Sequence, residues 1–310
     1  MSIPHLFRSL VFPFPSNLRR AFRLLHSTHI HPYVESMNLT ARTSKLDAMK
    51  TGSSIQVIIL ALLKMVHVQR LAIDFACPAE LYEYIRNSKQ IKQLIWTRLS
   101  SNAINSGQAQ CQLEAIEFSA VRRKSYIPAR LIMKSASTLK SLSVHSREYL
   151  YTLWGYTQAR IFSSLTSFTF SSMDEDIAPR ILRDILELCP SIIALHLPTP
   201  LQYAFLLSPD ALPKLNTLNA GPNGFLLRIL EGRPVRRLFA NPRTVFSFPS
   251  ERQLLRNSSF SLLHVRIEHS CAEEFFSDVN RTLIYCEDLA LHVWIGGQTV
   301  RQFSPSRYLI

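Results

Sequence analysis

The sequence predicts an α/β solenoid in which one helix and one short strand repeat along the chain. The clearest unit is 181–197, where the periodicity changes across a Cys-Pro step. Ile181 and Ile185 recur at helical spacing, whereas Leu195 and Leu197 alternate as in a strand. The proline at this step cannot continue a helix, so the helix must end there.

The second observation is that the strand half of this unit recurs, with the pattern apolar-x-x-apolar-x-apolar. Its middle apolar residues are Leu71, Leu94, Ile116, Leu142, Phe168, Leu195, Leu218, Leu238, Val265 and Leu289. Consecutive members lie 20 to 27 residues apart, which fits a leucine-rich repeat. Residues 34–39, with Met37 in the middle, form a candidate first repeat. The asparagine typical of such repeats does not follow each strand, so an ordinary α/β domain is the alternative.

Helices are expected between these strands. The segment 53–68 is the most apolar, and we interpret it as a buried repeat helix with apolar residues on nearly every side. Gln56, Lys64 and its short length argue against a membrane span, so no membrane partner is expected. Further helices are predicted at 78–87, 128–136, 146–162, 176–189, 200–207, 225–230, 249–256 and 272–282. Gly296 and Gly297 predict a turn after the last strand.

Length and composition favour one continuous, ordered domain. A solenoid can extend over 310 residues because each repeat buries its apolar face against its neighbours. We divide it into an N-terminal cap-like segment with the first repeat, 1–50, and degenerate repeats over 51–310. Residues 1–50 contain no acid before Glu35, but their prolines argue against a transit helix.

The cysteine pattern and the absence of catalytic motifs argue against an enzyme and against a metal site. The five cysteines include no C-x-x-C pair, which favours buried thiols and a cytoplasmic or nuclear location. Nucleophile elbows, phosphate loops and H-E-x-x-H helices are absent, so we expect no enzyme, cofactor or metal. His29 and His31 are interpreted as a surface pair. An unrecognised enzyme would require a cleft with a perturbed titratable pair.

The best candidate for binding is the set of side chains that alternate with the buried strand residues, because in a curved solenoid they cover the concave sheet. These side chains are mixed and polar, which suits a protein target better than nucleic acid. The candidate partner-binding residues are Asp74, Thr97, Glu117, His145, Thr169, His196, Asn219, Arg266, Glu268 and His292.

The formal charge of +13 raises a second hypothesis, a nucleic-acid or anionic-surface binder. Basic residues are spread along the chain, which makes nucleic acid the less favoured partner. They are enriched at 122–124 and through 228–256, and the second region would be the contact surface under this hypothesis.

Two parts of the chain carry motifs of a known kind. The first comprises residues 4–12, 23–25 and 31–33, followed by the strand that ends at Leu39. It resembles the stretch after the F-box helices in fungal F-box proteins with degenerate leucine-rich repeats. The second, residues 186–197, is similar to the Leu-x-x-Cys-Pro-x-Leu-x-x-Leu-x-Leu units of the same family. The resemblance implies a non-catalytic module that holds a target protein for a cullin-based ubiquitin ligase. The F-box itself is not visible before the first candidate repeat, so the ligase adaptor is an expected partner only if an F-box precedes it.

Overall fold

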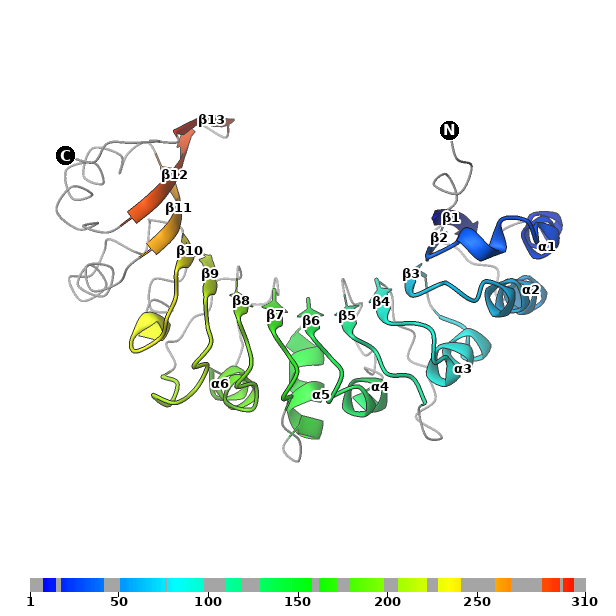
Figure 1. The fold of residues 1–310 in the computed structure, drawn as a ribbon, viewed down its shortest axis with the longest axis horizontal. Coiled ribbons are helices and arrows are strands. Elements are labelled where there is room, and N and C mark those ends of the chain that lie inside the picture. The colour runs from blue at the N-terminus through cyan, green and yellow to red at the C-terminus, as the bar shows by residue number, and fades with distance from the viewer. Residues whose placement is uncertain are drawn as a thin grey trace. The chain divides into compact units, whose positions relative to one another are not determined.

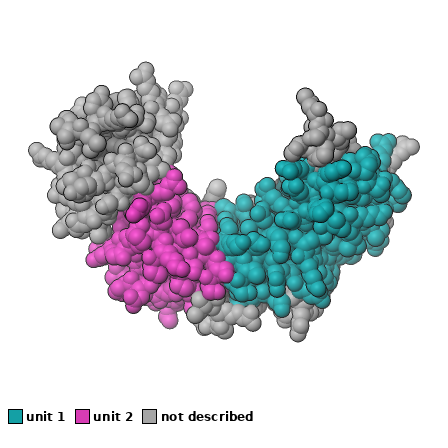
Figure 2. Space-filling model, viewed as in Figure 1, with its two compact units in different colours: residues 1–160 teal, residues 161–310 magenta. Residues whose placement is uncertain are grey.

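The computed structural model describes the main chain of residues 8–14, 18–41, 51–75, 77–97, 110–118, 129–145, 147–157, 162–171, 179–197, 206–221, 228–240, 260–268, 286–295 and 298–303. The chain divides into two compact units, Met1–Arg160 and Ile161–Ile310 (Figure 2). The division suggested by the sequence, between residues 50 and 51, stays a prediction.

Unit Met1–Arg160 is an α/β structure with a parallel sheet (Figure 1). Its strands are β1 (Ser9–Phe14), β2 (Ser36–Ala41), β3 (Arg70–Asp74), β4 (Gln93–Trp96), β5 (Ala115–Phe118) and β6 (Ser141–Val144). Its helices are α1 (Leu18–His26), α2 (Thr51–Lys64), α3 (Ala79–Asn87), α4 (Ala129–Lys134) and α5 (Arg147–Thr157), with a short 3-10 helix, η2 (His31–Tyr33). Each strand from β2 to β6 pairs in parallel with the strand before it.

Unit Ile161–Ile310 follows the same plan. Its strands are β7 (Ser167–Phe170), β8 (Ala194–His196), β9 (Thr217–Gly221), β10 (Arg237–Ala240), β11 (Phe260–Glu268), β12 (Cys286–Ile295) and β13 (Gln298–Phe303). The helix α6 (Pro179–Glu187) precedes β8, and one 3-10 turn covers 228–230. Pairing is parallel from β7 to β12, and β13 then pairs antiparallel with β12.

The predicted strands are confirmed, and the register within each unit supports the repeat alignment. Every predicted middle residue lies in a strand. In the first unit Leu71 pairs with Leu94, Leu94 with Ile116 and Ile116 with Leu142. Phe168, Leu195, Leu218 and Leu238 are matched in the same way in the second. Apolar residues at these positions are buried because the helices cover this face of the sheet.

The alignment of β11 is wrong by two residues. Leu263, not Val265, pairs with both Leu238 and Leu289. The strand satisfies the apolar pattern in two ways, beginning at Phe260 or at Leu262, and the sequence could not separate them. The pairing of β11 with both β10 and β12 corresponds to the pattern that begins at Phe260.

Two strands were not predicted. β1 lies inside the segment that we expected to be a cap, and Leu10 pairs with Met37, so a strand precedes the candidate first repeat. It was missed because its apolar residues do not alternate and it contains Pro13, which an edge strand tolerates. β13 was missed because it carries no buried-repeat pattern. The predicted turn at 296–297 lies outside the described residues, between two paired strands.

The same backbone connection recurs at the start of the strands in both units. The carbonyl oxygen of Glu35 accepts hydrogen bonds from the amides of Gln69 and Arg70, at 2.9 and 3.1 Å. The carbonyls of Arg8, Gln69, Lys92, Glu114, Thr166, Ile193 and Asn216 each accept two amides of the following strand in the same manner. We call this connection the strand-start joint. It fixes the register of each repeat on the preceding one without depending on side-chain type.

The helix predictions hold for the segments between the central strands. α3, α4, α5 and α6 lie within the segments predicted for them. Of the segment predicted as 225–230, the described residues 228–230 form a 3-10 turn, and residues 206 and 207, at the end of the segment predicted as 200–207, are not helical. The predicted helices 249–256 and 272–282 lie outside the described residues. α2 is not buried on nearly every side: Ile58 and Leu62 are buried, but Leu60 and Leu63 are 50% and 57% exposed.

The Cys-Pro step ends α6 as the sequence predicts. The Cys189 thiol donates to the carbonyl of Ile185 at 3.1 Å, and the Cys189 amide donates to Leu186 at 3.1 Å. Pro190 then begins the connection to β8. A buried thiol that bonds the last helical turn therefore closes the helix before the proline.

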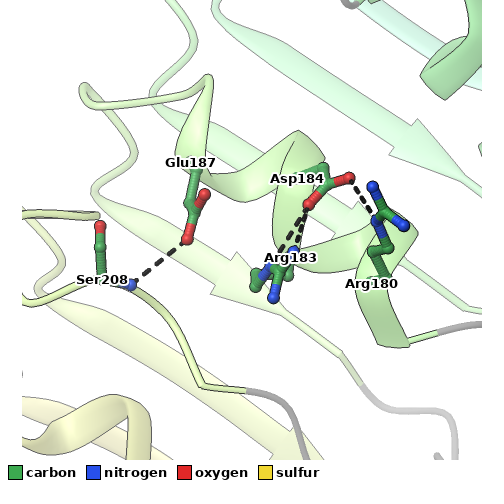
Figure 3. A network of polar contacts seen from close by, with 5 residues as sticks. All are labelled: Arg180, Arg183, Asp184, Glu187 and Ser208. Atoms are coloured by element: carbon green, nitrogen blue, oxygen red, sulfur yellow. Dashed lines mark hydrogen bonds and ion pairs between the residues drawn. The ribbon is translucent and has the colours of Figure 1, made fainter.

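The exposed side of α6 carries a polar network (Figure 3). Asp184 accepts two hydrogen bonds from the guanidinium of Arg183, at 3.2 and 3.0 Å, and lies 3.7 Å from Arg180 Nε. Glu187 accepts a bond from the amide of Ser208 at 3.3 Å, in the connection that leads to β9. Surface ion pairs of this kind contribute about 0 to 1 kcal/mol, so the network stabilises the helix only slightly.

Candidate functional surface

The side chains on the two faces of the sheet differ in burial. In β3, Leu71 and Ile73 are buried, while Arg70, Ala72 and Asp74 are partly or fully exposed. The same alternation holds in β4 to β8. We call the second set the open face. Because the strands are in register, open-face residues of neighbouring strands lie side by side in rows.

Two pairs of predicted residues come together on the open face of the first unit. Thr97 donates to the Asp74 carboxylate at 2.6 Å and to the carbonyl of Ile73 at 3.1 Å. Glu117 lies 3.9 Å from His145 Nε2. Each pair joins two repeats, so these side chains are held by their neighbours before any partner arrives.

Three predicted residues form one row in the second unit. Thr169 pairs with His196, and His196 pairs with Asn219. All three are half-buried. Burial lowers the pKa of His196, so its imidazole is neutral at pH 7 and offers one hydrogen-bond donor and one acceptor. The row therefore presents neutral hydrogen-bonding groups.

The remaining predicted residues are placed by their backbone alone. Arg266 pairs with His292 in the β11–β12 register, and Glu268 pairs with Trp294. The structure thus does not bring the ten predicted residues into one cluster. It distributes them over the strands of two units, as expected for a surface that makes many small contacts.

The prediction missed apolar members of the open face. Ile95 shares a row with Ala72 and Glu117, and Phe239 follows Asn219 in its row. Both are half-buried. Their spacing indicates their place, since each follows the middle residue of its strand, but an apolar side chain in a strand does not by itself indicate an exposed face. Apolar anchors between hydrogen-bonding groups are typical of protein interfaces.

The two histidines interpreted as a surface pair are not a pair. His29 is exposed, but His31 is 3% exposed, and its Nε2 lies 2.8 Å from the carbonyl oxygen of Leu24. Alternate residues share a face only in an extended strand, whereas η2 begins at His31 and turns its side chain inward. A buried hydrogen bond explains this imidazole without a metal. Within the described ranges, no three His, Cys, Asp or Glu residues are grouped so that they could hold a metal ion.

The thiols that are described are buried. Cys77, Cys111 and Cys189 are free and buried, as predicted. Burial raises the pKa of Cys111 to about 11 and that of Cys189 to about 12, so both stay protonated near neutral pH. A protonated, buried thiol is a poor nucleophile.

No protein-family model matches the chain, and no curated protein matches it in sequence.

One arginine of the basic region 228–256 bonds the protein's own backbone. Arg233 donates to the carbonyls of Ala211 and Ser208, both at 2.8 Å, and to those of Ile229 and Glu231, at 3.1 and 3.0 Å. Residues 241–256 and the basic stretch 122–124 lie outside the described residues. In the described part of the chain, no helix has the length and apolar character needed to cross a membrane.

Proposed function

We propose that the protein is a non-catalytic protein-interaction module built of leucine-rich repeats, and that its open face binds a target protein. The observation that carries this proposal is the open face itself. It consists of register-aligned rows that contain both hydrogen-bonding side chains and apolar residues such as Ile95 and Phe239.

The repeat type is supported by two independent features. The buried residues follow the apolar-x-x-apolar-x-apolar pattern at leucine-rich-repeat spacing. The strand-start joint recurs with the same two hydrogen bonds from repeat to repeat. In each joint the second of these amides makes the ordinary bond of a parallel ladder, so the feature that recurs beyond a common parallel sheet is the additional bond from the preceding amide.

A protein target fits the open face better than a nucleic acid does. A phosphate backbone requires a surface rich in Lys and Arg. The described open face of the first unit carries Arg70 as a cation, together with the carboxylates of Asp74 and Glu117. In the second unit the guanidinium of Arg233 is held by backbone carbonyls, and Arg237 is an exposed cation on the open face, where it pairs with Thr217. The alternative, a nucleic-acid or anionic-surface binder, therefore has less support.

The ligase connection rests on the resemblance to F-box proteins. We propose that the open face corresponds to the substrate-recognition surface of such a ligase subunit, in the cytoplasm or nucleus. A ligase adaptor is part of this proposal only for a form of the protein that carries an F-box before the repeats. Co-purification of that form, and not of this chain, with the adaptor is the expected result.

Site-specific photocrosslinking tests the open face. A photoreactive phenylalanine analogue is placed at Gln93, which is exposed on the open face, and in a control chain at Gln56, which is exposed on α2. We expect a discrete protein to be captured from Gln93 and not from Gln56. The captured protein is then purified and its affinity measured for the unchanged chain, for Ile95→Arg and for Gln56→Arg.

A loss of affinity of about tenfold or more in Ile95→Arg alone supports the proposal, because one buried charge at an interface costs more than about 1.4 kcal/mol. Equal affinity of all three chains would remove the open face as the binding surface. A steep loss of nucleic-acid binding with added salt, in place of a protein partner, would support the alternative.

A further inference from the structure

The residues at the strand-start joints form a row at the end of the first unit's sheet where its strands begin. In chain order they are Arg8, Glu35, Gln69, Lys92, Glu114 and Lys140. Opposite charges meet along this row: Arg8 Nε lies 3.4 Å from Glu35 Oε1, and Lys140 Nζ lies 2.7 Å from Glu114 Oε2. The hydrogen bond from Lys140 and the charge of Lys92 hold the pKa of Glu114 below its usual value.

Gln69 interrupts this alternation. Glu114 has a lysine on each side of it in the row, whereas Glu35 has Arg8 on one side and the neutral amide of Gln69 on the other. The carboxylate of Glu35 is 55% exposed. It therefore has room to accept hydrogen bonds from a second cation.

A pocket lies at this point of the row, beside Glu35 and Gln69. It has a volume of about 470 Å³ and is lined by Pro32, Glu35, His67 and Gln69. These residues belong to two adjacent connections, one before β2 and one before β3, which the joint at Glu35 holds together. Glu35 supplies a carboxylate to this lining, and Gln69 and His67 add further hydrogen-bonding groups.

This lining has the chemistry of a guanidinium site. A guanidinium is planar, always charged and presents five donors, so it can bond a carboxylate and an amide oxygen at once. The contact of Arg8 with Glu35 shows that this carboxylate accepts a guanidinium. Because both side chains of that pair are more than half exposed, their pair contributes little and can be replaced.

The surroundings favour an arginine within a polypeptide over a free amino acid. Tyr33 follows Pro32 in the chain and is 40% exposed, and Val66 precedes His67 and is 60% exposed. These exposed side chains are next in the chain to residues that line the pocket, so they are available to contact the residues that flank an arginine in a peptide. A free amino acid would instead place its charged ammonium and carboxylate groups there.

We infer that the pocket between Pro32, Glu35, His67 and Gln69 binds an arginine side chain of a partner protein, with Glu35 accepting the guanidinium. The site lies at the strand starts of the first unit and does not depend on the open face, so it can hold whether or not the proposed function does.

The test uses Nα-acetyl-L-arginine amide, which imitates an arginine within a chain, and follows the backbone amide resonances of His67 and Gln69 by NMR. The neutral isostere Nα-acetyl-L-citrulline amide is the matched probe. The variants are Glu35→Gln, Arg8→Gln and, as a control at another strand-start joint, Glu114→Gln. Each change keeps the backbone carbonyl that forms the joint.

We expect the arginine probe, and not the citrulline probe, to shift both resonances. Glu35→Gln should weaken binding about tenfold or more, since hydrogen bonds to charged groups are strong. Arg8→Gln should strengthen it by up to about fivefold by removing the competing cation. Glu114→Gln should leave it unchanged.

The inference is overturned by the absence of shifts at His67 and Gln69, by equal binding to Glu35→Gln, or by an equal loss in Glu114→Gln. Equal shifts with the citrulline probe would also overturn it. Binding of free L-arginine without binding of the blocked probe would show a metabolite site and overturn the assignment to a partner protein.

Discussion

Arg233 illustrates how a single side chain connects two repeats. Its guanidinium bonds four backbone carbonyls, two in the connection before β9 and two around the 3-10 turn before β10. Gly232, with a φ of 72°, precedes it, in a region of backbone space that favours glycine. The side chain thus satisfies carbonyls that lie outside the α-helices and strands, and its guanidinium stabilises the connections between two repeats.

Replacing Arg233 by lysine tests this role. Lys keeps the charge but offers one ammonium in place of the planar fork, so most of the carbonyl bonds are lost. We expect Arg233→Lys to lower the free energy of unfolding by about 1 to 3 kcal/mol. Arg228→Lys, at an exposed position of the same turn, should change it by less than about 0.5 kcal/mol. Urea denaturation of the two variants measures the difference, and equal values would contradict a structural role.

Glu114 gives a prediction for pH dependence. Its pKa is lowered in the folded state by the hydrogen bond from Lys140, so its contribution is present above the unfolded pKa of about 4.3. That contribution is lost as the pH falls through the folded pKa. We expect Glu114→Gln to cost less than about 1 kcal/mol at pH 7, because the pair is exposed.

Denaturation from pH 7 to pH 3 measures this difference between Glu114→Gln and the unchanged chain. The difference should shrink in acid, and it should also shrink at high salt. A difference that grows as the pH falls would show that Glu114 is stabilised in its protonated form, contrary to its environment.

At the scale of the element, α2 shows the limit of an apolar sequence pattern. Leu62 is fully buried, whereas Leu60 and Leu63, on either side of it, are at least half exposed. We expect the double change Leu60→Ser and Leu63→Ser to alter the free energy of unfolding by less than about 1 kcal/mol. Leu62→Ser should cost about 3 kcal/mol or more, since it leaves a cavity and a buried hydroxyl.

Thermal denaturation of the two chains separates the burial states of these leucines. If the double variant were as unstable as Leu62→Ser, the outer side of α2 would be covered in solution. A decrease in binding of a hydrophobic dye by the double variant is the second expected result, because its exposed apolar area is smaller.

The strands and central helices could be predicted because burial imposes a period on their sequence. Leu71, Leu94 and Ile116 are spaced by the repeat, and the pairing confirms them. The errors occur where that constraint fails. β1 has apolar residues on both faces, and β11 fits the pattern in two registers. The buried contact of His31 with Leu24 is likewise set by tertiary structure.

The open face was predicted as a surface but not as a set of contacts. Alternation with buried leucines placed Asp74, Thr97 and His196 on it, because period two separates the faces of a strand. The bond from Thr97 to Asp74 and the row through His196 depend on register between repeats, which one sequence does not contain. The pocket at Glu35 was missed for the same reason, since its lining comes from two connections.

At the scale of the whole molecule, the charge of +13 is not matched by an excess of cations on the described open face of the first unit. There, Arg70 stands with the carboxylates of Asp74 and Glu117. Repulsion between copies of a cationic chain opposes association between them, while a surface of mixed charge can still engage a partner. Under the proposed function, specificity for a partner depends on the rows of open-face side chains. The register between neighbouring repeats places these rows.

Because each repeat is stabilised by its neighbours, a substitution in one repeat of the first unit should destabilise the adjacent strands most. Leu94 lies at the middle position of β4, is 1% exposed and pairs with Leu71 and Ile116. Leu94→Ala should cost about 2 to 5 kcal/mol locally, and in a solenoid each repeat is stabilised chiefly by its two neighbours. Amide hydrogen exchange should therefore lose protection most in β3, β4 and β5 and least in β1. A uniform loss over β1 to β6 would show one cooperative core, and the stacking of independent repeats would have to be abandoned.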